Sequence, residues 1–246
     1  MARTLRGAGS VLFALFTATA WGWSTVLKDL GWINDTQRAI ILAVLTLLLA
    51  LQQTYLVLPK PVNRGIVEAR RPVTQQHLGT FLAAYYRLLK KARGASRTQP
   101  AVRVNVMLPT RRLRGLLGTK LRIYYVACPS GILYGDNELT LDWGKDEGTC
   151  GYAWAHKVIS PFDSANPQLA LPAKRLSTRQ LEVVGAIGST LSIPIMSPDG
   201  ATLGVLNLDS KQNVSDTLFS ETAVYTLAEA CARELVAQCF PDGVAA

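Results

Sequence analysis

The sequence predicts an α+β protein in two parts: an N-terminal transmembrane helical hairpin, then a soluble domain with a central antiparallel sheet flanked by helices. Three observations lead to this prediction. Two long segments near the N-terminus contain no charged residue. The remainder alternates between segments with helical periodicity and segments with the two-residue periodicity of strands. Short turns that contain glycine or proline join successive strand segments, which is typical of antiparallel pairs.

The two uncharged segments cover about residues 8–27 and 39–58. Each has the roughly 20 residues that a helix needs to cross a bilayer. Basic residues are more numerous on the terminal side of the two segments than in the loop between them, so both termini are expected in the cytoplasm. A signal peptide is the alternative for the first segment, but no clean small-residue cleavage site follows it. We therefore expect a multi-pass protein of a bacterial inner membrane, with residues 1–59 as the hairpin and the soluble domain in the cytoplasm.

The formal net charge of +9 is unevenly distributed. Residues 60–122 hold 15 basic side chains and one acidic side chain, whereas residues 123–246 hold 7 basic and 14 acidic ones. A basic region next to a membrane span typically contacts anionic lipid. Nucleic acid is an unlikely partner, because no reading helix, ribonucleoprotein signature or zinc site accompanies the charge. Arg111, Arg112 and Arg114 are expected at a hairpin tip, where they could alternatively bind a phosphate.

The first half of the soluble part begins with a linker and a helix. Residues 60–73 contain two prolines, a glycine and many charges, which predicts a basic juxtamembrane linker with little regular structure. Residues 74–93 place apolar side chains at three- and four-residue steps, which predicts an amphipathic helix that starts the domain at residue 74. Alternation then predicts strands over 102–108, 121–127 and 138–143, the first two forming a hairpin.

Shorter elements are expected in the middle of the domain. The segment GTCGYAWAHK, residues 148–157, is typical of a short helix opened by glycine. Residues 158–176 contain three prolines and are expected to be mostly loop. Ser177 and Gln180 have the spacing of a capping box, which predicts a helix over 178–184.

The last elements are a hairpin and a long helix. Residues 190–196 and 201–209 flank the turn sequence Ser-Pro-Asp-Gly, with proline at the second turn position. Residues 221–239 have helical periodicity, with Ser220 as the expected N-cap. The domain is expected to end at residue 240, followed by a tail, 241–246.

Four cysteines occur in this part of the chain, none in a CxxC pair. Neither a zinc site nor a thioredoxin-type dithiol is therefore indicated. Cys231 and Cys239 are expected on one buried face of the last helix, and Cys128 at the buried end of a strand. The two histidines are too far apart in sequence to suggest a metal site.

In order and spacing, these motifs resemble a GAF domain. The resemblance covers roughly residues 75–240 and rests on three segments: GTCGYAW after the third expected strand, SIPIMSPDGATLGVLNLDS over the last hairpin, and FSETAVYTLAEACARELV in the last helix. It implies a six-stranded sheet, helices shared with the partner of a homodimer, and a ligand pocket. GAF domains bind varied small molecules, so the ligand remains unknown; a nucleotide is one option.

The expected pocket lies between the sheet and the segments around 142–176. Aromatic walls with a few polar groups suit a planar ligand. The backbone amides at the start of the 148–157 helix would suit an anionic group. Each aromatic residue could equally be ordinary core. The candidate ligand-binding residues are Tyr124, Asp142, Trp143, Thr149, Cys150, Tyr152, Trp154 and Asn207.

The main functional hypothesis is a membrane-anchored sensory or regulatory protein that binds a small ligand and is not an enzyme. No kinase, cyclase, phosphodiesterase or DNA-binding signature is present, so the signal would pass to an unidentified output protein, to an identical copy or to the hairpin. One alternative is a ligand-gated effector whose spans disrupt the membrane. A second is a thiol enzyme or redox sensor, because GTCG resembles a cysteine segment of the free methionine-R-sulfoxide reductases. Cys150, at a helix start, would then be the reactive thiol. That family's catalytic cysteine has no counterpart here, since residues 183–188 contain no cysteine.

Overall fold

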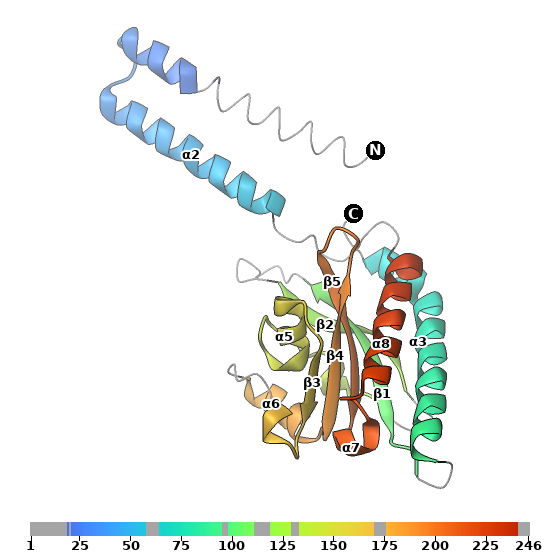
Figure 1. Ribbon diagram of the computed structural model, residues 1–246. Coiled ribbons are helices and arrows are strands. Elements are labelled where there is room, and N and C mark those ends of the chain that lie inside the picture. Colours follow the sequence, from blue (N-terminus) through green and yellow to red (C-terminus); the bar gives the residue numbers. More distant parts are fainter. Residues whose placement is uncertain are drawn as a thin grey trace. The chain divides into compact units, whose positions relative to one another are not determined.

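The structure is a computed structural model that describes residues 19, 21–57, 64–94, 98–110, 119–128, 133–169 and 176–240. It divides into two compact units, Met1–Pro59 and Lys60–Ala246. Each unit is described separately. Figure 1 shows the elements of both units coloured along the sequence.

The first unit consists of helical segments. Residues 21–29 are helical and end in a turn, after which α2 spans Asp35–Val57. Asn34 and Gln37 cap the start of α2 reciprocally, since each side-chain oxygen accepts from the other residue's backbone N–H. In the part of the chain that is described, no helix has both the length and the apolar character needed to cross a bilayer. The predicted span 8–27 falls mostly outside the described residues.

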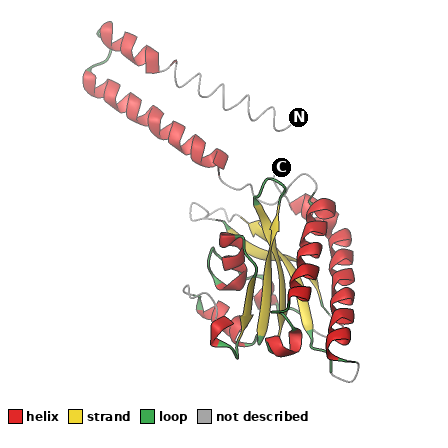
Figure 2. Ribbon diagram, in the orientation of Figure 1, coloured by secondary structure: helices red, strands yellow, loops and turns green. Residues whose placement is uncertain are grey.

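The second unit is built on a five-stranded sheet (Figure 2). Its strands are β1 (Val102–Thr110), β2 (Lys120–Ala127), β3 (Ser160–Asp163), β4 (Ser189–Met196) and β5 (Thr202–Ser210). The order is β2-β1-β5-β4-β3, and every neighbouring pair is antiparallel. The central strands are buried on both faces, so their apolar side chains can contribute to two separate cores.

Two long helices cover one face of this sheet (Figure 1). Helix α3 spans Arg64–Arg93, and α8 spans Thr222–Glu234 before continuing as a π-helix, Leu235–Cys239. Leu78, Tyr85 and Leu89 of α3 are fully buried in the main core with residues of α8 and the sheet. Tyr85 donates a hydrogen bond to the carbonyl oxygen of Thr217 at 2.6 Å, which ties α3 to a segment far along the chain.

Short helices cover the opposite face. They are α4 (Asp136–Leu139), α5 (Gly148–His156) and α6 (Thr178–Gly185); a 3-10 turn (Pro167–Leu169) and α7 (Val214–Thr217) complete the described elements. A second, smaller core lies beneath them and includes Met107, Leu121, Trp143, Trp154 and Val205. The predicted α+β class, with a central antiparallel sheet and flanking helices, is confirmed.

Several sequence predictions hold in detail. The capping box at the start of α6 is present, since Gln180 N–H donates to Ser177 Oγ and the Gln180 side chain accepts from Ser177 N–H. The β4–β5 hairpin closes through the predicted Ser-Pro-Asp-Gly turn, whose Gly200 has a φ of +78° that favours glycine. Cys231 and Cys239 are buried in the main core as predicted, whereas Cys128, predicted to be buried, is only half-buried.

Three predictions about element boundaries are wrong. Residues 64–73 of the predicted linker belong to α3, because buried Val67 anchors this turn to the core. Tyr125 donates to the Val67 carbonyl oxygen at 3.0 Å, which ties the first turn of α3 to β2. Pro72 lies within the same helix and supplies no N–H to it. The expected N-cap Ser220 does not cap α8, which begins after Glu221. Part of the expected loop 158–176 forms strand β3.

The predicted strand over 138–143 is also wrong. Only Trp143 pairs with the sheet, through two backbone hydrogen bonds to Leu121 of 2.7 and 2.9 Å. The residues before it form α4, since the Glu138 carboxylate accepts the Gly135 N–H and also binds Arg103. These contacts override the alternating pattern, and five strands are described where the resemblance implied six.

Candidate functional site

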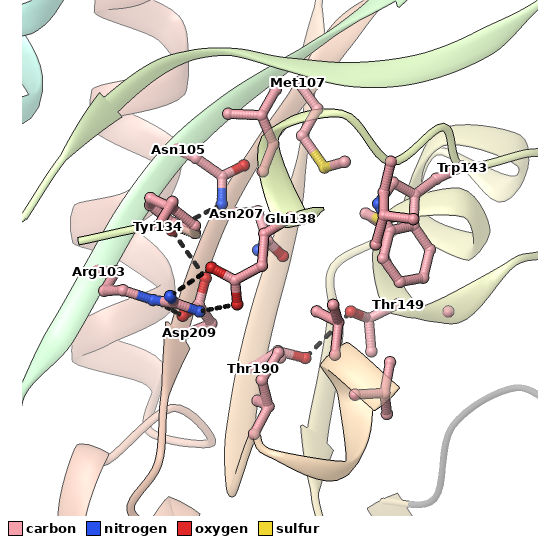
Figure 3. Close-up of a pocket in the computed structure, with 17 residues that line it drawn as sticks. Arg103, Asn105, Met107, Tyr134, Glu138, Trp143, Thr149, Thr190, Asn207 and Asp209 are labelled. Carbon is pink, nitrogen blue, oxygen red and sulfur yellow. Dashed lines mark hydrogen bonds and ion pairs between the residues drawn. The ribbon is translucent and has the colours of Figure 1, made fainter. Parts of the chain in front are cut away.

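A cavity of about 60 Å³ lies on the sheet face covered by the short helices (Figure 3). It opens between strands β1, β4 and β5 and the helices α4, α5 and α6. Its lining residues are Arg103, Asn105, Met107, Ile123, Tyr134, Glu138, Leu141, Trp143, Gly148, Thr149, Cys150, Val183, Val184, Ile187, Thr190, Asn207 and Asp209. Since a water takes up roughly 30 Å³ in the liquid, the cavity suits a small ligand or one functional group of a larger one.

The two-residue period of the strands divides their side chains between the two faces. Arg103, Asn105 and Met107 of β1 line the cavity, and Asn207 and Asp209 do so from β5. The intervening side chains of both strands belong to the main core on the helix side. Because β1 and β5 are adjacent and antiparallel, Asn105 lies directly opposite Asn207, and Arg103 opposite Asp209.

A buried ion cluster forms the polar end of the cavity (Figure 3). Arg103 Nε donates to Asp209 Oδ1 at 2.6 Å, and its terminal nitrogens donate to both oxygens of Glu138 at 2.8 and 3.1 Å. Burial raises the pKa of Asp209, and the Arg103 guanidinium opposes that rise. One cation therefore faces two carboxylates. A wider hollow of about 620 Å³ borders the same three side chains.

Tyr134 continues the cluster toward the middle of the cavity. Its hydroxyl donates to Asp209 Oδ2 at 2.8 Å and accepts from Asn105 Nδ2 at 2.9 Å, and its ring lies 4.1 Å from the Arg103 guanidinium. Asn105 is only 1% exposed, yet its Oδ1 has no hydrogen-bond partner among the described residues. A buried carbonyl oxygen without a donor costs roughly 1–3 kcal/mol. The oxygen is itself almost fully enclosed, so a bound N–H or O–H would satisfy it only after a small displacement of neighbouring side chains.

Hydroxyl groups form a second polar row beside the cavity. Thr149 Oγ1 lies 3.0 Å from Thr190 Oγ1 and 2.9 Å from Ser192 Oγ. Ser192 in turn donates to Asn207 Oδ1 at 2.7 Å. This row joins α5 to β4 and β5, with Ser192 in contact with the side-chain amide of Asn207.

The Gly-Thr-Cys-Gly segment has a structural role at the start of α5. Gly148 has a φ of +63°, which favours glycine, and it lies against the Trp143 ring. Cys150 is buried, and burial raises the pKa of its thiol to about 12. Burial therefore opposes the low thiol pKa expected at a helix start, because desolvation disfavours the charged thiolate.

Half of the sequence-predicted ligand-binding residues meet at this cavity. Those that line it are Trp143, Thr149, Cys150 and Asn207. Four predicted residues lie outside its lining. Tyr124 packs on the main core, and Trp154 is part of the smaller core. Asp142 is paired with Arg122, and the Tyr152 ring lies tilted against that of His156. Three of the four aromatic candidates, Tyr124, Trp143 and Trp154, pack in the two cores, and of these only Trp143 also lines the cavity.

The sequence interpretation missed the polar end of the cavity. Arg103, Asn105 and Asp209 interrupt otherwise apolar strands, and a polar residue within a doubly buried strand is a signal that could have been used. Tyr134 and Glu138 could not have been found in this way. Tyr134 precedes any predicted element and Glu138 was assigned to a strand, so only the fold brings them to the strands of the cavity.

No protein-family model and no curated protein matches the chain. Solved structures resemble it at low identity. A type II free methionine-R-sulfoxide reductase from Thermoplasma acidophilum is 15% identical, with 70% of this chain and 96% of that chain covered and a TM-score of 0.40. A protein named as a GAF sensor from Burkholderia vietnamiensis is 14% identical, with 73% and 89% covered and a TM-score of 0.38.

The GAF domain region of a protein named as a membrane protein from Geobacter sulfurreducens is 20% identical, with 67% of this chain and 96% of that chain covered and a TM-score of 0.37. At these values no ligand or activity is transferred from the solved structures to this chain. The functional argument that follows depends on the cavity and its residues.

Proposed function

We propose that this protein is a sensory or regulatory protein of the GAF type, in which the cavity beside β1 and β5 binds a small ligand. The observation that carries this proposal is the unsatisfied Asn105 Oδ1 at a buried cavity wall. A group of this kind is rarely left without a partner in a folded protein. The apolar lining and the few convergent polar groups of this cavity are typical of ligand sites.

The proposal includes anchoring in a bacterial inner membrane through the uncharged segments 8–27 and 39–58. Their length and the excess of cations on the terminal side support this arrangement, with the sheet domain in the cytoplasm. The basic residues between 60 and 122 would then meet anionic lipid. Membrane flotation of the full chain tests this part, since recovery of the protein in the soluble fraction contradicts it.

Helices α3 and α8 are the proposed route by which binding is transmitted. They pack on the opposite face of the sheet that lines the cavity, so a shift of β1 reaches α3 and a shift of β4 reaches α8. The signal would pass to an unidentified partner protein or to a second copy in a homodimer. Burial of the Cys150 thiol argues against the thiol enzyme and the redox sensor as alternatives.

Ligand binding is tested by native mass spectrometry of the full chain, purified in detergent from its own cells. Val184 lines the cavity from α6, and Val184→Phe would fill it. Leu181→Phe is the matched control, because Leu181 lies on the same helix and is 55% exposed. We expect a bound small molecule on the wild-type chain and on Leu181→Phe, and its loss from Val184→Phe. A wild-type mass without any ligand, or equal retention by both variants, would contradict the proposal.

A further inference from the structure

The orientation of the Asn105 amide is set by the ion cluster. The Asp209 carboxylate is held by Arg103 and accepts the single hydroxyl proton of Tyr134. The Tyr134 oxygen must then accept a proton at its other contact, so Asn105 presents its NH₂ to Tyr134. Asn105 Oδ1 is therefore the side of the amide without a partner; its residue lines the cavity, and the oxygen itself is almost fully enclosed.

Asn207 presents the complementary group from the neighbouring strand. It is the cross-strand partner of Asn105, and opposite residues on one sheet face have Cβ atoms roughly 5 Å apart. With the single Ser192 hydroxyl proton donated to Asn207 Oδ1, and Ser192 accepting from Thr149, the NH₂ group of Asn207 is left to face a ligand. The two amides together offer one acceptor and one donor group, side by side at the same cavity wall (Figure 3).

The charges at this end of the cavity exclude an anionic partner. The Nε and both terminal nitrogens of Arg103 already donate to Asp209 and Glu138. The cluster therefore has one more carboxylate than cations, and a ligand carboxylate or phosphate placed there would meet uncompensated negative charge. The remaining walls are apolar and include Met107 and Trp143.

We infer that this cavity binds a small neutral molecule through a carboxamide-type group, as found in primary amides, ureas and lactams. The ligand N–H donates to Asn105 Oδ1, and the ligand carbonyl oxygen accepts from Asn207 Nδ2. The apolar part of the ligand lies toward Trp143. This inference depends on the proposed ligand-binding function and adds the chemical class of the ligand.

Propionamide, propionate and 2-butanone make a matched set of probes, since they are similar in size and differ in the group presented to the two asparagines. Binding to the full chain in detergent is measured by saturation-transfer NMR titration. The signal from the blocked variant Val184→Phe in the same detergent is subtracted. We expect propionamide to bind about tenfold or more tightly than either other probe, because only propionamide satisfies both amides. Equal affinity for all three probes, or no propionamide binding, would overturn the inference.

Two variants locate the site. Asn105→Leu removes the acceptor, and we expect it to weaken propionamide binding about tenfold or more. Asn137→Leu, on exposed α4, is the matched control and should bind as the wild type does. Asn207→Leu gives an independent reading should Asn105→Leu prove unstable. Unchanged affinity in a folded Asn105→Leu or Asn207→Leu variant would refute the assignment.

The two proposals fail in different ways. If native mass spectrometry finds a molecule that Val184→Phe loses but that has no carboxamide, urea or lactam group, the ligand-binding function stands and the amide inference fails. If the wild-type chain binds neither a cellular molecule nor propionamide, both fail.

Discussion

Removing the cation from the buried ion cluster should destabilise the sheet domain strongly. The Arg103 side chain is 13% exposed, and its partners Asp209 and Glu138 are 4% and 18% exposed. Arg103→Leu would leave two carboxylates buried together without a counter-charge. Breaking a buried pair in this way costs about 3–5 kcal/mol of unfolding free energy. This is a large share of the roughly 5–15 kcal/mol that holds a typical domain folded.

The loss should depend on pH in a defined direction. Burial already raises the pKa of Asp209 above its ordinary 3.8, and Arg103 opposes that rise. When folding raises the pKa of a carboxyl group, its contribution to stability is greatest at a pH below the unfolded-state pKa. That contribution is lost as the pH rises through the folded-state pKa. Loss of Arg103 moves the folded-state pKa higher still. The stability of Arg103→Leu should therefore rise more between pH 7 and pH 5 than the stability of the wild type does.

Urea unfolding of the full chain in detergent measures this effect, with the emission of buried Trp143 and Trp154 as the signal. With a slope of about 1–3 kcal/mol per molar urea, the midpoint at pH 7 should fall by at least about 1 M. Arg71→Leu is the control, because the ion pair of Arg71 with Glu68 is exposed and contributes little. An Arg103→Leu midpoint close to that of Arg71→Leu, or the same loss at both pH values, would refute the reasoning.

Three further outcomes are expected. Gly204→Ala should lower the urea midpoint far more than Gly185→Ala. A methyl group at Gly204 would lie 2.5 Å from a backbone oxygen of β1, whereas a methyl group at Gly185 would have nothing within 4 Å. Similar midpoints for the two variants would refute this prediction. Cys150 should resist iodoacetamide at pH 8 in the folded chain and react in urea, since burial raises its pKa to about 12; peptide mass spectrometry distinguishes the two states. Tyr85→Phe should cost about 1–3 kcal/mol in the same unfolding assay by leaving the Thr217 carbonyl unsatisfied, and an unchanged midpoint would contradict the assigned hydrogen bond.

The sequence was most informative where local chemistry and periodicity agree. The Ser177–Gln180 capping box and the hairpin around Gly200 depend on neighbours within a few residues, and both were predicted correctly. The segment 138–143 alternated as a strand does, yet its first two residues end α4 and only Trp143 pairs with the sheet, while Glu138 binds the distant Arg103. Local pattern cannot predict an element that a long-range ion pair determines.

The candidate site was likewise predicted where a local sequence signal exists and missed where only distant contacts define it. Trp143 and Thr149 were found because they lie next to a recognisable glycine segment. Asn105 was missed because it appeared as one polar residue in an apolar strand. Its importance depends on two contacts outside its own strand, the hydrogen bond to Tyr134 and the cross-strand pairing with Asn207. Such contacts exist only once the sheet order is known.

The hydrogen bond between Tyr85 and Thr217 has a consequence for synthesis of the protein. The two residues are 132 positions apart, so the surface of α3 that packs against the C-terminal helices is made well before its partner. At about 5–20 residues per second, a ribosome needs roughly 7–26 s to cover that distance. During this interval the apolar side chains of α3 are available to chaperones and to other nascent chains. We therefore expect C-terminally truncated chains that lack α8 to accumulate with chaperones or in aggregates.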